Sequence, residues 1–163
     1  MKLSERRAPE LLVTCLGLGY APVASGTFGT LAGIALAGIA GWFAPGFYLP
    51  LMVVLAVAAT AASVAAGPWA ERFYGRKDPS AFVLDEVAGF LVAAAWPAFP
   101  GWSHLVLAFL LFRWFDVWKP WPANSLQSLP HGWGIVMDDI AAGAWALLVL
   151  VGLRAAFPGF IGV

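Results

Sequence analysis

The sequence predicts an all-α fold: a multihelical integral membrane bundle with about four to five membrane-embedded helices and short interfacial helices. The chain is 61% hydrophobic and only 11% charged, whereas soluble domains carry about 25% charged residues. No Lys, Arg, Asp or Glu occurs between Leu11 and Ala70, which is long enough for more than one span of about 20 residues. The length predicts one domain over residues 1–163.

Composition also excludes several classes of protein. The formal net charge is zero, and no basic stripe or nucleic-acid motif is present, so we expect no nucleic-acid partner. Cys15 is the single cysteine; it excludes an internal disulfide or a cysteine-built metal site and is expected to pack as a small apolar residue. No cleavable signal peptide is evident, so retention in the membrane should rest on the chain's own helices.

The sequence of the first half of the chain predicts a polar cap followed by two membrane-spanning helices. Met1–Glu10 is a cytoplasmic or interfacial cap, and Leu11–Ala21 is a short, glycine-containing lead-in expected to be interfacial or re-entrant. The first span is predicted near Thr27–Phe43 and the second near Phe47–Ala66, with a break at Pro45. Small residues recur at four-residue steps in the first span, which predicts close packing against another helix. These residues are Gly29, Gly33, Ala37 and Gly41.

The middle of the chain predicts three shorter elements. Pro68–Asp78 reads as a short amphipathic helix that starts at its proline and breaks at Gly75. Val87–Trp96 is an apolar helix with two acidic residues in its first turn, followed by an uncharged aromatic turn typical of a membrane interface. Leu105–Phe115 then returns to the first side, and Pro120 stops that helix.

The last part predicts a polar loop at Ala123–Val136 and a final helix at Ile140–Phe157, with Asp138-Asp139 at its start and Pro158–Val163 as a tail. With the N-terminus in the cytoplasm, the basic residues of the inner loops return to the cytoplasmic side, and the outer turns near Pro45 and Pro97 carry none. This asymmetry follows the positive-inside rule and puts the acidic clusters on the cytoplasmic side.

The acidic residues suggest a divalent-cation site. Adjacent pairs, Asp85-Glu86 and Asp138-Asp139, are expected at two helix starts, and Asp116 lies on a third helix. Carboxylate oxygens suit Mg²⁺, and packed carboxylates would repel each other without a cation. Taken singly, an acidic pair at a helix start is more often a cap that complements the helix dipole.

The basic residues suggest a phosphate. If the helix continues as far as Lys119, then Arg113, Asp116 and Lys119 share one helix face. The two bases could hold phosphate oxygens; the alternative is pairing with Asp116 and membrane anchoring. Gly26 and Thr27 precede a helix, where N–H groups could face an anion, although a plain cap is the commoner reading. His131 has acid–base chemistry, but a lone loop histidine is usually incidental.

Four segments together resemble the phosphatidylglycerophosphatase A family, in order and spacing, from about Leu16 to Leu148. They are Gly26–Thr30 (GTFGT), Val83–Gly89 (VLDEVAG), Phe112–Pro122 (FRWFDVWKPWP) and Gly132–Gly143 (GWGIVMDDIAAG). The resemblance implies a multi-pass protein of the bacterial inner membrane: an Mg²⁺-dependent lipid phosphatase that hydrolyses phosphatidylglycerophosphate to phosphatidylglycerol and phosphate at the cytoplasmic face, in glycerophospholipid biosynthesis.

The resemblance also implies roles for individual residues. The metal ligands would be Asp85, Glu86, Asp138 and Asp139, holding one or two Mg²⁺ ions. The catalytic residues would be Asp116, Asp85 and Lys119, with Asp116 orienting water or acting as base; a covalent aspartyl-phosphate on Asp116 is the alternative. The phosphate would be bound by Arg113, Lys119, Gly26 and Thr27.

Other functions remain open at this point. One is a phosphatase for another lipid phosphate, although the motifs of phosphatidic-acid-phosphatase enzymes and CDP-alcohol transferases are missing. A small cation transporter would place acids through the depth of the membrane, whereas here they cluster at the ends of spans. A structural membrane subunit would leave the acidic clusters unused. An oligomer is not indicated.

Overall fold

The structure is a computed structural model that describes residues 3–157, and within that range every regular element is helical. The all-α prediction is therefore confirmed for the described residues. The elements in order are α1 (Leu3–Val13), η1 (Leu18–Tyr20), α2 (Ser25–Phe43), η2 (Pro45–Phe47), α3 (Tyr48–Tyr74), α4 (Leu84–Ala93), α5 (Trp102–Trp118), α6 (Ala123–Leu126) and α7 (His131–Ala156). The predicted tail, Pro158–Val163, and the first two residues of the predicted cap lie outside the described residues.

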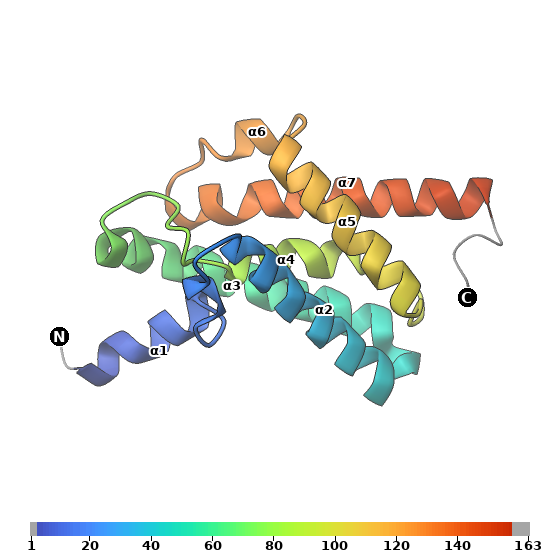
Figure 1. Cartoon of the computed structure of the whole chain (residues 1–163), viewed down its shortest axis with the longest axis horizontal. Coiled ribbons are helices and arrows are strands. Elements are labelled where there is room, and N and C mark those ends of the chain that lie inside the picture. Colours follow the sequence, from blue (N-terminus) through green and yellow to red (C-terminus); the bar gives the residue numbers. More distant parts are fainter. Residues whose placement is uncertain (1–2, 158–163) are drawn as a thin grey trace.

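The short helix α4 lies at the centre of the bundle, in contact with α2, α3, α5 and α7 (Figure 1). Most of its residues are buried, including Phe90 and Leu91. A helix that is apolar on all sides needs neighbours on all sides. The segment that seemed short for a membrane crossing is thus a core helix enclosed by longer ones.

Three helical segments are long and apolar enough to cross a membrane: Ser25–Phe43, Pro45–Tyr74 and His131–Ala156. The first corresponds closely to the predicted span. The number of embedded helices expected from the sequence, four to five, stays a prediction, because α4 has 10 residues and α5 has 17.

Two predicted helix boundaries are wrong. Helix α3 does not restart at Pro68 but runs through it to Tyr74, and Gly75 ends it in a left-handed conformation. Gly67 lies so close to Gly132 of α7 that a Cβ on it would be 2.3 Å from that residue's Cα. Packing against α7 therefore holds this part of α3 helical, as neighbouring helices do around prolines in membrane proteins.

The second wrong boundary is the start of the last helix. Helix α7 begins at His131, not at Ile140, and the predicted loop contains α6. Gly132 and Gly134 gave the impression of a loop, yet both are helical. A Cβ on Gly132 would be 2.5 Å from the Val64 carbonyl oxygen of α3, so this glycine permits helix contact instead of a turn.

The stripe of small residues on α2 is confirmed as a packing surface. Gly29 faces Val83 and Gly33 faces Phe90, where added Cβ atoms would approach to 2.7 Å and 2.9 Å. Gly41 meets Phe99 at the other end of the helix. Helix α2 therefore packs closely along α4 and the aromatic turn that follows it.

The closest helix contact joins α4 and α7 through Gly89 and Gly143. A Cβ on Gly143 would be 2.1 Å from the Gly89 carbonyl oxygen, and a Cβ on Gly89 would be 2.6 Å from the Asp139 carbonyl oxygen. Both neighbours are backbone atoms, which cannot move aside as a flexible side chain would. This crossing fixes the spacing of the two helices.

We expect Gly143→Ala to lower the free energy of unfolding by about 1–3 kcal/mol, because overpacking against backbone forces the helices apart. Gly152→Ala, on the same helix with nothing within 4 Å of the added Cβ, is the control; it should be neutral or raise stability by up to about 1 kcal/mol. Chemical denaturation in detergent measures both. Equal stability of the two variants would contradict the assigned role of the α4–α7 contact.

The described part of the predicted cap and the start of the predicted lead-in form α1, and the rest of the lead-in contains η1. This N-terminal segment holds the loop that precedes α4. The Val83 N–H donates to the Val13 carbonyl at 2.8 Å, and a Cβ on Gly19 would be 2.0 Å from the Ala81 carbonyl oxygen. Cys15 packs against the hydrophobic core, as expected, and burial, with the Glu86 charge as a smaller cause, raises the pKa of its thiol to about 11. The N-terminal segment thus fixes where α4 begins.

Candidate functional site

One end of the bundle gathers the charged side chains. Helices α2, α4 and α7 begin there and α3 and α5 end there, as the alternating directions of the chain in Figure 1 require. The topology therefore brings the three acidic clusters to the same end of the bundle, as predicted. The opposite ends of α2 and α4 lead into the uncharged turns, whereas the last turn of α7 carries Arg154.

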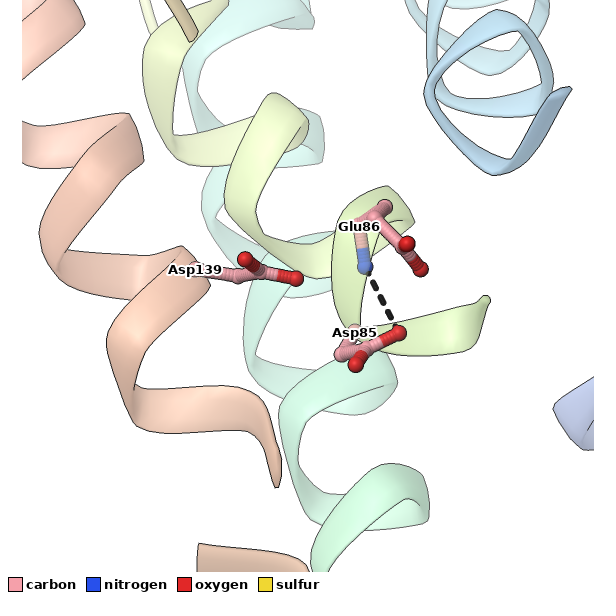
Figure 2. Close-up of side chains that lie close together, drawn as sticks. All are labelled: Asp85, Glu86 and Asp139. Carbon is pink, nitrogen blue, oxygen red and sulfur yellow. Dashed lines mark hydrogen bonds between the residues drawn. The ribbon is translucent and has the colours of Figure 1, made fainter. Parts of the chain in front are cut away.

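Asp85, Glu86 and Asp139 form the centre of the group, which we term the carboxylate cluster. One carboxylate oxygen from each lies within 4.8 Å of the others. Figure 2 shows Asp139 extending from α7 toward the first turn of α4, where the Glu86 N–H donates to Asp85 Oδ1 at 3.0 Å. Asp85 is 5% exposed and Asp139 is 4% exposed, so these carboxylates are almost fully withdrawn from water.

The glycine contact explains why the cluster forms. Gly89 lies four residues after Asp85, and Gly143 lies four residues after Asp139, so each glycine is one helical turn from its carboxylate. The close approach of backbone at the glycines therefore brings the two acidic turns together. This is a property of two helices in contact, and neither helix shows it alone.

Asp138 is one of the four predicted metal ligands, but its side chain is turned away from the carboxylate cluster. Its Oδ2 accepts hydrogen bonds from Lys119 Nζ at 2.6 Å and from Gln127 Nε2 at 3.1 Å. Its Oδ1 is buried and has no partner among the described residues. Adjacent residues on a helix point about 100° apart, and the early start of α7 makes Asp138 and Asp139 helix-interior residues, not a helix start as predicted.

Gln127 was missed by the sequence reasoning. It follows α6 in the segment predicted as a loop, and its backbone carbonyl accepts a hydrogen bond from Lys77 at 2.8 Å. No sequence pattern marks a single glutamine as a partner for an aspartate eleven residues later. Its contact depends on the fold of the α5–α7 connection.

Arg113 and Asp116 form an ion pair at 2.6 Å on α5. The Asp116 charge also acts on Glu86 and Asp139, so it lies beside the carboxylate cluster. The predicted pairing of Arg113 with Asp116 is therefore present, at the edge of the cluster. Lys119, for which the same pairing was raised, caps the end of α5 and pairs with Asp138 instead. Phosphate binding by Arg113 and Lys119 stays a prediction.

Lys119 lies at the end of α5 with its ammonium on Asp138. Burial acts to lower the pKa of Lys119, but the hydrogen bond and charge of Asp138, with further carboxylates nearby, raise it above its ordinary value of 10.5. The pair is thus present at neutral pH, and on the basic side it is lost as the pH rises through the raised pKa of Lys119. Lys119 adopts φ 49°, a left-handed conformation that costs a non-glycine residue about 1–2 kcal/mol.

Gly26 lies directly against the site. A Cβ at this position would be 2.3 Å from Glu86 Oε1 and 3.1 Å from Arg113 Nη1. No side chain caps the start of α2, and Ser25 Oγ instead donates to the Ser80 carbonyl at 2.6 Å. The Thr27 N–H donates to the Ala24 carbonyl at 2.8 Å, so it is already engaged.

His131 is not brought into the cluster. Its Nδ1 lies 2.8 Å from Glu71 Oε2, and its side chain is 65% exposed. It begins α7 with φ 49°. The incidental reading of this histidine agrees with its position.

The charges of the site fit a divalent cation. Six carboxylates, counting Asp78 next to the group, meet Arg113 and Lys119, each of which is already paired with one aspartate. Among the described residues, no Lys or Arg forms an ion pair with the carboxylate cluster, although the Arg113 charge acts on Glu86. Glu86 Oε2 is also buried without a hydrogen bond. Buried carboxylates are costly unless they are paired or bind a metal, and an all-oxygen donor set suits Mg²⁺.

Comparisons with known proteins agree on one family. The sequence model described as phosphatidylglycerophosphatase A matches residues 11–154. A Haemophilus influenzae protein named phosphatidylglycerophosphatase A is 32% identical over 160 residues, covering 94% of this chain and 93% of that protein. An Escherichia coli protein of the same name is 31% identical over 139 residues, covering 82% and 76%.

A third relative bears a different name. A Bacteroides thetaiotaomicron protein named "Putative phosphatidylinositol-3-phosphatase" is 36% identical over 156 residues, which cover 90% of this chain and 93% of that protein. No solved structure matches the chain.

Proposed function

The chain belongs to the phosphatidylglycerophosphatase A family of phosphatases, and from this premise we propose that it hydrolyses phosphatidylglycerophosphate to phosphatidylglycerol and phosphate with the help of Mg²⁺. The observation that carries the proposal is the convergence of three carboxylates from two helices, with Asp85 and Asp139 buried and Glu86 half-buried, beside an arginine. A lipid phosphatase needs such a site where membrane meets water. We further propose a multi-pass location in the inner membrane with this end of the bundle facing the cytoplasm.

Asp85, Glu86 and Asp139 would hold the metal, with the free Oδ1 of Asp138 facing the same end of the bundle. When bound, Mg²⁺ would supply Lewis-acid polarisation of the phosphate and a more acidic water. The residues themselves supply the framework: α4 and α7 hold their carboxylates fixed, so little reorganisation is needed during the reaction.

Arg113 is proposed to bind the substrate phosphate through its planar guanidinium. Gly26 allows Glu86 and Arg113 to lie directly against the start of α2, where the phosphate is proposed to bind, and Thr27 lies in the same turn of α2. Lys119 would add a second positive charge near the phosphate while it orients Asp138. Asp116 is proposed to orient the attacking water or take its proton. Water adds to phosphorus, the bond to the glycerol oxygen breaks, and that oxygen leaves with a proton.

A substrate panel tests the proposal with the full chain in detergent. We expect phosphate release from phosphatidylglycerophosphate to exceed release from phosphatidic and lysophosphatidic acids. Release should fall to background in EDTA and return on addition of excess Mg²⁺, because the carboxylate cluster lacks another cation. Full activity in EDTA would refute the metal assignment.

A second candidate is a phosphatase for an inositol lipid phosphate, favoured by the name of the Bacteroides relative. Both substrates present a phosphate monoester at the membrane surface, so the same cluster could serve either. Phosphatidylinositol 3-phosphate therefore belongs in the panel, and a higher kcat/KM for it would replace the first candidate.

A further inference from the structure

The outer face of α5 carries a groove of about 640 Å³. It is lined by Leu110, Trp114, Val117 and Trp118, together with Arg113. All four apolar side chains are more than half exposed in the described structure. The face continues toward the start of α5 with Val106, one turn before Leu110 and also exposed.

Arg113 belongs to both the groove and the site. Its Nη1 lies 2.6 Å from Asp116 Oδ2, and it closely approaches Gly26, where the Glu86 carboxylate also lies. The groove is therefore continuous with the carboxylate cluster through a shared side chain. A molecule that extends along α5 from this arginine has one end at the site and the other against apolar side chains.

Such a surface fits an amphiphile with an anionic head. Arg113 is the one charged residue in the described lining, and the remaining lining is aliphatic and aromatic, with Leu110 before it along α5 and Val117 and Trp118 after it. An acyl chain that comes from the bilayer is already out of water, so its gain here is van der Waals packing against the aliphatic and aromatic side chains, and the guanidinium pairs well with phosphate. Leu110 lies one turn from Arg113, on the side away from the charged end of α5.

A second apolar cavity lacks this connection. It measures about 540 Å³ between α3 and α7 and is lined by residues such as Val57, Val64 and Trp133. No charged side chain lines it. It could receive hydrocarbon, but nothing there would hold a phosphate.

We infer that the α5 groove binds an acyl chain of the lipid substrate, so that the lipid reaches the site sideways from the bilayer with its phosphate at Arg113. The inference rests on the proposed function and deepens it. It assigns chain-length preference to α5, a helix whose outer face no protein element covers at these positions in the described structure.

Leu110→Trp in the full chain tests the inference, because it fills the groove without touching the carboxylate cluster. Phosphate release would be measured from dioleoyl and dihexanoyl phosphatidylglycerophosphate. We expect the ratio of kcat/KM for the long-chain to the short-chain lipid to fall at least tenfold. Val57→Trp is the matched control, since Val57 is also an exposed aliphatic residue lining an apolar cavity; its ratio should equal that of the wild type.

An unchanged ratio in Leu110→Trp, or an equal fall in Val57→Trp, would overturn the inference. If the wild-type chain releases phosphate from neither lipid, the proposed function itself fails, which is a separate result. If Leu110→Trp does not fold, a labelling experiment on the wild-type chain still tests the inference. A non-hydrolysable phosphonate analogue with a photoreactive group in its acyl chain should label α5, and excess unlabelled analogue should remove the label. Competed label in α3, or no competed label, would refute the groove.

Discussion

Replacement of Asp139 by asparagine is expected to reduce Mg²⁺-dependent phosphate release by about a thousandfold. Asp139 is the only residue that α7 contributes to the carboxylate cluster, so its loss removes one side of the proposed metal site. Several kcal/mol of transition-state stabilisation depend on such a cation, and about 1.4 kcal/mol corresponds to a factor of ten. The measurement is kcat/KM for phosphatidylglycerophosphate as a function of Mg²⁺ concentration.

Asp138→Asn is the matched control on the neighbouring residue. Its Oδ2 accepts from Lys119 and Gln127, and an asparagine oxygen can still accept those hydrogen bonds. We therefore expect a smaller fall in activity and little change in the Mg²⁺ concentration required for half-maximal release. The two variants differ by one position in the same helix, so equal Mg²⁺ dependence would contradict the assignment of Asp139 as the ligand.

Gly26→Ala is expected to lower kcat/KM about a hundredfold while the protein remains folded. The added Cβ would be 2.3 Å from Glu86 Oε1, so the Glu86 carboxylate must move. Because this carboxylate is the end of a flexible side chain, the movement costs the fold little. A displacement of about 1 Å at a reacting centre can still cost about a hundredfold in rate.

Gly152→Ala controls for the effect of a methyl group on a helix, since its Cβ would meet nothing within 4 Å. Thermal unfolding in detergent should give similar midpoints for Gly26→Ala and the wild type. Normal activity of Gly26→Ala would show that Glu86 is not fixed by contact with α2. A large fall in its midpoint would show instead that Gly26 acts through packing.

Much of the fold followed from local patterns. The charge-free run before Ala70 and the proline breaks predicted α2 closely, and the four-residue steps of small residues predicted its packing face. The end of α3 and the start of α7 were harder to predict because Pro68 and Gly132 usually end or interrupt helices. Here both lie where α3 and α7 touch, and that contact keeps the backbone helical.

The residue types of the site were also readable, since few charged residues occur in this chain and most of those in the second half gather at one end. Which of these residues lie close to one another could not be predicted from the sequence. Asp138 and Asp139 form one motif in the sequence, but the helix turns the first toward Lys119 and the second toward Asp85. No pattern in the sequence predicted that Gln127 is part of the site.

By itself, the sequence determined that this protein is helical, that its apolar segments suit a membrane, and that its family is phosphatidylglycerophosphatase A. These properties depend on composition and on spacing along one chain. Only the tertiary structure decided which carboxylates lie together and which side chain lies between them and an apolar groove. Such contacts arise where two helices approach, and here the absence of side chains at Gly89 and Gly143 sets that approach.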